Sequence, residues 1–66
     1  MQILLNGSPC EVADNASVAA LLATTVFAQR RVAVEVNREI VPKSQHAQRT
    51  LRSGDHVEIV QAMGGG

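Results

Sequence analysis

The stretch Val32-Ala33-Val34-Glu35-Val36-Asn37-Arg38-Glu39-Ile40-Val41-Pro42 carries the clearest structural signal in the sequence. Its first five residues alternate, which places three valines on one face of a strand. A turn at Asn37-Arg38-Glu39 and a short strand at Ile40-Val41 follow. Pro42 ends that strand because it has no N–H to donate. The stretch therefore predicts two strands joined by a turn.

The residues before this stretch predict a hairpin and a helix. A first strand is predicted at Gln2 to Leu5, and Asn6-Gly7 is a strong signal for a hairpin turn. The second strand of this hairpin is predicted at Pro9 to Val12, with Pro9 as its first residue. Oxygen-bearing side chains then precede an apolar pattern at helical spacing, which continues toward Val26 and Phe27. The helix start rests on Asp14, Asn15 and Ser17, and the apolar spacing on Val18, Leu21 and Leu22.

The residues after it predict a helical turn and a last strand. Ser44 is a candidate cap for a turn through Gln45 to Gln48, and a second turn spans Arg52 to Asp55. His56 to Val60 form the last strand, with Val57 and Ile59 on one face and Glu58 and Val60 on the other.

This order of elements predicts an α+β fold, a mixed sheet with one helix packed on one face. We expect one domain over residues 1–63, followed by a flexible glycine tail at residues 64–66. Phe27 is the only aromatic residue, so the core must be aliphatic.

Composition excludes several function classes. The 66 residues hold six acidic and six basic side chains, and the basic ones are scattered, which argues against nucleic-acid binding and against a polybasic membrane anchor. Cys10 is the only cysteine, so no intrachain disulfide is possible. The opening residues lack a signal-peptide pattern, and no apolar run approaches a membrane span. We therefore expect a cytoplasmic protein.

The C-terminal glycines carry the functional signal. Gly64, Gly65 and Gly66 contribute no packing, so we expect a mobile tail that can thread a narrow channel in a partner and carry its carboxylate about 10 Å at roughly 3.3–3.6 Å per residue. Frayed residues or a cloning remnant are the alternative. At neutral pH the carboxylate is an anion and a poor electrophile. The chain has no recognisable nucleotide-binding motif, so a partner enzyme must activate it, and this protein is a substrate rather than a catalyst.

Other candidate residues fall into two groups. Leu4, Val60 and Met63 form a predicted apolar docking patch on the sheet face away from the helix, although isolated surface apolar residues are also common. Apart from an ionic contact of Arg30 and Arg31 with a partner, which is the alternative to a solvated turn, the second group is predicted to have ordinary structural or solvated roles, without a metal site or an acid/base pair. It comprises Cys10, Asp14, Arg30, Arg31, Glu35, His46, His56 and Glu58.

The chain resembles the ubiquitin-like β-grasp sulfur carriers, and most closely the ThiS-type carriers of thiamine biosynthesis. The similarity covers nearly the whole length and rests on four segments, with Gly64 as a departure because a larger residue often precedes the final two glycines. The segments are Met1-Gln2-Ile3-Leu4-Leu5-Asn6-Gly7, Val36-Asn37-Arg38-Glu39-Ile40-Val41-Pro42, Ser53-Gly54-Asp55-His56-Val57-Glu58-Ile59-Val60 and Gly65-Gly66.

This resemblance implies a cycle. An E1-like adenylyltransferase would use ATP and Mg²⁺, neither bound by this chain, to adenylate Gly66. Sulfur from a cysteine desulfurase or a persulfide relay protein would then give a Gly66 thiocarboxylate, which would donate sulfur at thiazole synthase. Two alternatives remain: a molybdopterin-pathway sulfur carrier, and a ubiquitin-like modifier joined to protein lysines through Gly66.

Overall fold

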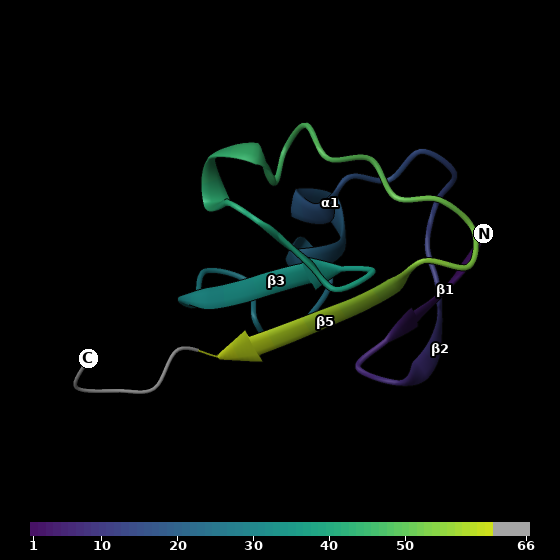
Figure 1. Cartoon of the computed structure of the whole chain (residues 1–66), viewed down its shortest axis with the longest axis horizontal. Coiled ribbons are helices and arrows are strands. Elements are labelled where there is room, and N and C mark those ends of the chain that lie inside the picture. Colours follow the sequence, from purple (N-terminus) through teal and green to yellow (C-terminus); the bar gives the residue numbers. More distant parts are fainter. Residues whose placement is uncertain (62–66) are drawn as a thin grey trace.

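A five-stranded mixed sheet dominates the computed structural model, which describes residues 1–61. The strand order is β2-β1-β5-β3-β4, with the parallel β1–β5 pair near the middle and antiparallel pairs elsewhere (Figure 1). The elements are β1 (Gln2–Leu5), β2 (Ser8–Glu11), α1 (Val18–Ala23), β3 (Val32–Val36), β4 (Glu39–Val41), the 3-10 helix η1 (Lys43–Gln45) and β5 (His56–Gln61).

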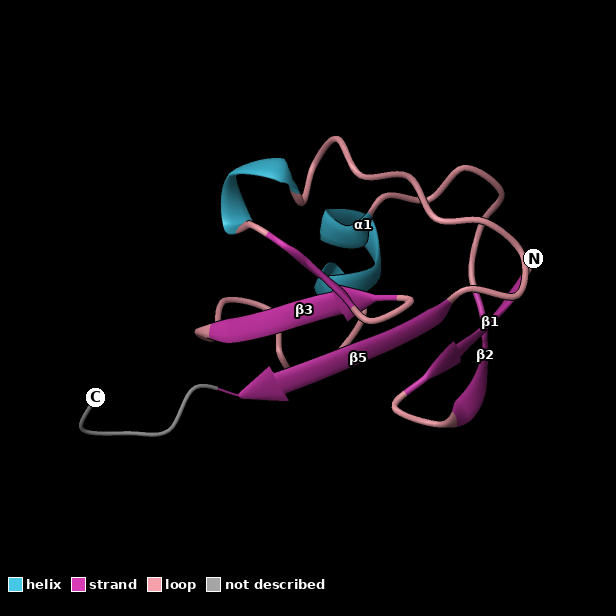
Figure 2. Cartoon of the chain, in the orientation of Figure 1, coloured by secondary structure: helices cyan, strands magenta, loops and turns pink. Residues whose placement is uncertain are grey.

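Both helical segments lie on the same side of the sheet, and the other face is left open (Figure 2). The predicted α+β fold, a mixed sheet with one α-helix on one face, is thus confirmed. In the described part of the chain, neither helix is long and apolar enough to cross a membrane.

Two hairpin turns share the same backbone geometry. Asn6 and Gly7 have φ values of 49° and 85°, and Asn37 and Arg38 have 52° and 69°. Positive φ at both central residues gives the twist that a two-residue hairpin requires, and asparagine and glycine adopt it most readily. The second turn is one residue shorter than predicted, because Glu39 already pairs with Val36 in β4.

The α1 helix begins where the sequence indicates and ends earlier than it suggests. Ser17 is the N-cap, and its Oγ accepts a hydrogen bond of 3.0 Å from the N–H of Ala20. After Ala23, the hydroxyls of Thr24 and Thr25 donate to main-chain carbonyls one turn back, at 2.7 and 2.8 Å. Such local bonds compete with helix propagation. The prediction that the apolar helical face continues toward Val26 was therefore wrong, since Val26 is 75% exposed in the following loop.

Two other predicted helix and strand boundaries also differ. Ser44 does not cap a helical turn: η1 starts at Lys43, directly after Pro42, without a side-chain cap, and so Ser44 lies inside it. Pro9 is the second residue of β2 rather than the first. It is tolerated because β2 is an edge strand and Pro9 faces Leu4 at a position whose main-chain groups point away from β1.

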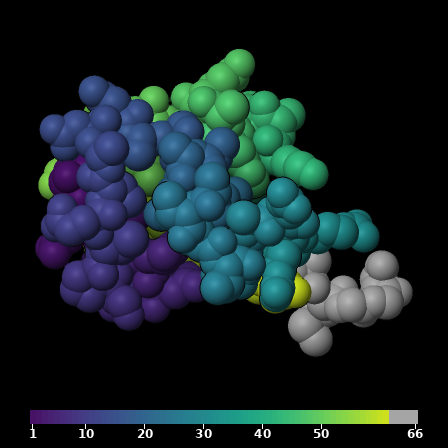
Figure 3. All heavy atoms as spheres, turned by 180° about the vertical axis from the view of Figure 1, so that it is seen from behind, coloured from purple at the N-terminus to yellow at the C-terminus, as the bar shows by residue number. Residues whose placement is uncertain are grey.

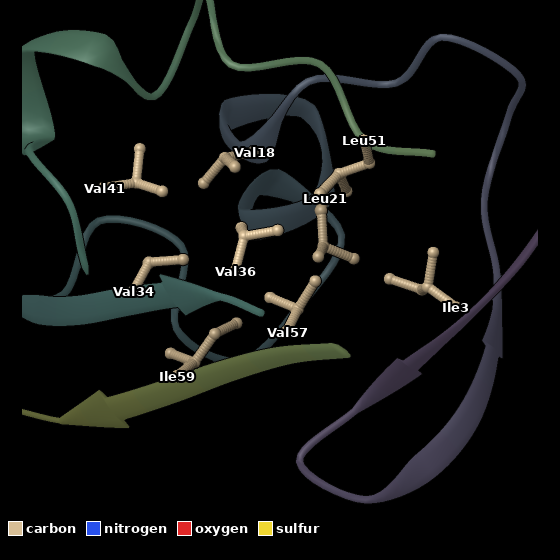
Figure 4. Packing of buried hydrophobic residues seen from close by; sticks show 9 residues of the cluster. All are labelled: Ile3, Val18, Leu21, Val34, Val36, Val41, Leu51, Val57 and Ile59. Carbon is tan, nitrogen blue, oxygen red and sulfur yellow. The ribbon is translucent and has the colours of Figure 1, made fainter. Parts of the chain in front are cut away.

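The core fills the space between α1 and the sheet (Figure 4). All nine buried apolar residues are aliphatic, as predicted, and Phe27 packs against them only partly buried. Leu51 is a core residue that belongs to no helix or strand. The nine are Ile3, Val18, Leu21, Val34, Val36, Val41, Leu51, Val57 and Ile59.

Candidate functional site

The root of the C-terminal tail is the end of β5. The predicted reactive residue Gly66, the predicted tail residues Gly64 and Gly65, and Met63 of the predicted docking patch lie outside the described residues. The last described residue, Gln61, pairs with Val32 of β3. The last described strand, β5, therefore ends at the left end of the sheet in Figure 1.

Asn6 holds β5 beyond the point where strand pairing on the β1 side ends. The β1–β5 ladder runs only from Leu4–His56 to Leu5–Val57. The main chain of Asn6 then donates to the carbonyl of Val57 at 2.8 Å. Its side chain replaces the next rung of the ladder: Oδ1 accepts from the N–H of Ile59 at 2.8 Å, and Nδ2 donates to the carbonyl of Ile59 at 3.4 Å.

Asn37 secures the beginning of the same strand. Its Oδ1 accepts from the N–H of His56 at 2.9 Å, and its Nδ2 donates to Oδ1 of Asp55 at 3.0 Å. The other oxygen of Asp55 accepts from the N–H of Arg52 at 2.8 Å. The buried Asp55 carboxylate therefore serves as a structural acceptor. The turn patterns predict Asn6 and Asn37 only as turn residues and do not indicate their bonds to β5.

The predicted docking residues share the open face but are not adjacent. Leu4 is half-buried and lies opposite His56, whereas Val60 is 58% exposed. Val60 is four positions after His56 along β5, which is about 13 Å at roughly 3.3 Å per residue. Glu58 projects from the same face between them, because side chains alternate along β5. The described part of the predicted patch is thus two apolar positions with an acidic side chain between them.

The centre of the open face is acidic. Glu35 of β3 and Glu58 of β5 are directly opposite each other. Ile40 of β4, which is 70% exposed, lies next to Glu35 on the other side. Like charges opposite each other on one face destabilise a sheet. Ile40 was not included in the predicted patch, and its place on this face follows only from the β3–β4 register.

The remaining candidate residues occupy structural positions. Cys10 is half-buried and packs against the core. His46 is buried, with Nε2 2.9 Å from the carbonyl oxygen of Val41, and its own carbonyl accepts from the N–H of Ala19. His46 thus anchors the η1 turn to β4 and α1, a deeper position than the predicted turn role implied. Within residues 1–61, no three potential metal-ligating side chains come together.

Comparison with protein families gives a match over nearly the whole chain. The model of the ThiS family matches residues 3–66. The chain belongs to the ThiS family. A solved member, the crystal structure of the thiamine biosynthesis protein (ThiS) from Geobacter metallireducens, superposes with a TM-score of 0.84 at 34% identity and covers 100% of both chains. The predicted ubiquitin-like ThiS fold is confirmed by this neighbour.

This ThiS family member is similar to proteins of its own length and to part of longer proteins. The sulfur carrier protein ThiS of Escherichia coli (strain K12) is 35% identical over 66 residues, which is 100% of both chains. A thiazole synthase of Paramagnetospirillum magneticum is 44% identical over the same 66 residues. The chain spans 20% of the length of that enzyme. A ThiS-like segment therefore occurs both as a protein of this length and within a longer chain.

Proposed function

We propose that this ThiS family member is the sulfur carrier of thiamine biosynthesis, and that it carries sulfur as a thiocarboxylate on Gly66. The observation that supports this most strongly is the match to the Escherichia coli sulfur carrier over the full length of both chains. The geometry is consistent with the proposal, because β5 is held at its start and along its length and ends at Gln61, five residues before Gly66 in the sequence.

In the proposed cycle, a Gly66 carboxylate oxygen attacks the α-phosphorus of ATP within an E1-like adenylyltransferase, where Mg²⁺ would bind the phosphates. Pyrophosphate leaves and an acyl adenylate remains. The terminal sulfur of a persulfide, supplied by a cysteine desulfurase or relay protein, attacks the carbonyl carbon and displaces AMP. A thiol then reduces the acyl disulfide, releasing the thiocarboxylate and forming a disulfide with the former persulfide carrier. ATP is required because a carboxylate anion resists nucleophilic attack.

The chain itself contributes a rigid body rather than catalytic groups. Asn6 and Asn37 form side-chain hydrogen bonds that hold β5. The open face would offer Leu4 and Val60 for docking, together with Met63 of the predicted patch. Gly64 and Gly65 lack side chains and would pass through a channel too narrow for other residues. We place the protein in the cytoplasm, where a lone cysteine and a persulfide donor suit a reducing environment.

Thiazole synthase is the proposed acceptor of the sulfur. Thiazole synthases that contain a ThiS-like segment support this pairing, because a segment within the same chain stays close to that enzyme. The molybdopterin-pathway carrier and the protein modifier remain alternatives with the same activation chemistry, and no feature of the described residues favours either of them.

Genetic rescue tests the pathway. In a strain that requires thiazole because it lacks its own carrier, we expect the intact chain to restore growth without thiazole, and a variant lacking Gly65 and Gly66 to fail. A strain lacking the molybdopterin-pathway carrier serves as the matched control and should not be rescued. Rescue of the control strain alone would contradict the thiamine assignment.

A further inference from the structure

A hollow with a basic rim lies beside the root of the tail. Its volume is about 580 Å³, and it is bounded by the loop after α1, the start of β3 and the η1 turn. Leu22, Phe27 and Val32 supply apolar surface. Arg30, Arg31 and Lys43 are exposed at its borders. An apolar hollow with few charged groups is the general form of a binding site.

The hollow also contains an open sheet edge. Pairing between β4 and β3 stops at Val41 opposite Val34, although β3 extends two residues further, to Val32. In an antiparallel ladder, alternate residues direct their main-chain groups to the same side. The N–H and carbonyl of Val32 therefore point, like those of Val34, to the side where β4 has ended. An extended peptide could bond to them by strand addition.

The charges around the hollow have no described counterpart. Within residues 1–61, Arg30, Arg31 and Lys43 form no ion pair, and both ion pairs found there involve the N-terminal amine, with Glu11 and Asp14. Glu35 and Glu58 lie on the open face of the sheet. Acidic side chains thus lie on the open face of the sheet and basic side chains around the hollow, although the net charge of the chain is zero. The hollow therefore presents a positive surface to a partner.

The position of the hollow connects it to the tail. Val32 pairs with Gln61, and Nη1 of Arg30 donates to Oε1 of Gln61 at 3.5 Å. Figure 3 shows the blue-to-teal atoms of the α1–β3 segment next to the yellow end of β5. Five residues follow Gln61 in the sequence and can span at most about 18 Å, at roughly 3.3–3.6 Å per extended residue. An enzyme that holds Gly66 in its active site must therefore come within this distance of Gln61, close to the hollow.

We propose that the basic hollow binds an acidic, extended segment of the adenylating enzyme. Carboxylates of that segment would face Arg30, Arg31 and Lys43, an apolar side chain would contact Phe27, and the segment's main chain would bond to Val32. This inference rests on the proposed function, because it assumes that the enzyme takes Gly66 into its active site. It adds a second contact surface, on the helix side, to the docking patch on the open face.

Steady-state adenylation of the full chain by its adenylyltransferase tests this surface. The test variant is Arg30→Glu with Arg31→Glu, and the control variant is Arg38→Glu with Arg52→Glu. Both change the net charge equally at exposed sites, but the control residues lie at the opposite end of β5. We expect the test variant to raise KM about tenfold with little change in kcat, and the control variant to change KM by less than about twofold. Added salt should raise the wild-type KM more than that of the test variant.

Three outcomes would overturn the inference while leaving the proposed function intact. These are an unchanged KM in the test variant, an equal rise in both variants, or faster adenylation of the test variant. The last would indicate that the arginines hold the chain's own carboxylate instead. Absence of adenylation of the wild-type chain would overturn both the proposed function and this inference. Far-ultraviolet circular dichroism of each variant checks that it is folded.

Discussion

At the scale of single residues, two asparagines each form part of a turn and also hold β5 through side-chain hydrogen bonds. Asn6 and Asn37 adopt positive φ in their hairpins, and each also bonds through its side chain to the main chain of β5. A buried main-chain N–H or carbonyl without a hydrogen-bond partner lowers the stability of the fold. The two asparagine side chains bond to N–H groups of β5 that have no partner in a neighbouring strand. The strand that they hold is the last element before the proposed reactive residue Gly66.

Asn37→Ala should lower the free energy of unfolding by about 2 kcal/mol, because it removes two hydrogen bonds and leaves Oδ1 of the buried Asp55 without its partner. Asn15→Ala is the matched control, since Asn15 also has a positive φ (65°). No side-chain hydrogen bond of Asn15 appears among the described residues. Urea denaturation of both variants measures the difference. Equal losses would show that the backbone geometry, and not the bonds to β5, accounts for the effect.

At the scale of elements, the irregular segment between η1 and β5 closes one side of the core. Leu51 is only 2% exposed, and its N–H donates to the carbonyl of Ala16 at 2.8 Å. The N–H of Val18 donates to Arg49 in the same segment at 2.9 Å. The segment thereby ties the start of α1 to the chain that leads into β5.

Leu51→Ala should cost about 2–5 kcal/mol of stability, because it leaves a cavity in the core. A chain of this length has roughly 3–10 kcal/mol in total, at about 0.05–0.15 kcal/mol per residue, so a large unfolded fraction is expected. Leu4→Ala, the same change on the open face, should cost less than about 1.5 kcal/mol. The stabilities of the two variants are compared by thermal unfolding, monitored by circular dichroism. A Leu51→Ala variant as stable as Leu4→Ala would contradict the assigned core.

The open face of the sheet is the second element to test. Val60→Asp should leave the fold intact, within about 1 kcal/mol, because Val60 is exposed and only its strand propensity is lost. It should nevertheless raise KM for adenylation if the open face docks the enzyme. Ala20→Asp is the matched control: it adds the same charge at an exposed position of α1 and should leave the KM for adenylation unchanged. A Val60→Asp variant adenylated at the wild-type rate would remove the predicted docking patch.

Sequence patterns predicted the regular elements well, for physical reasons visible in particular residues. The alternation over Val32–Val36, the turn pair Asn6-Gly7 and the cap Ser17 all act locally, so their spacing alone is informative. The early end of α1 depends on which way the threonine hydroxyls turn, and the burial of Leu51 depends on contacts with distant elements. Neither is encoded in local periodicity.

The candidate site was predictable to a smaller extent. Alternation placed Leu4 and Val60 on one face, but only the strand register shows that Glu58 lies between them and that Glu35 lies opposite Glu58. The basic hollow was not predictable, because Arg30 and Lys43 come together only through the packing of η1 beside β3. The glycine tail stays a prediction from composition, because residues 64–66 lie outside the described residues.

At the scale of the whole molecule, the proposed function of the fold is to present one chemical group to other proteins. The core and the asparagine bonds hold β5, the open face and the basic hollow are the two proposed docking surfaces on either side of its end, and the glycines follow that end in the sequence. Such a division lets the same carboxylate visit several enzymes. The central claim is that this carboxylate, on Gly66, is the group that carries sulfur.

Mass spectrometry of the C-terminal peptide tests that claim most directly. The chain is incubated with its adenylyltransferase, ATP, Mg²⁺, a persulfide source and a thiol, beside a control chain extended by one alanine after Gly66. We predict that one oxygen is exchanged for one sulfur in the wild-type peptide that ends at Gly66, and that the control is unchanged. Sulfur found on Cys10 instead, or Gly66 found joined to lysine side chains of other proteins without any thiocarboxylate, would contradict the account.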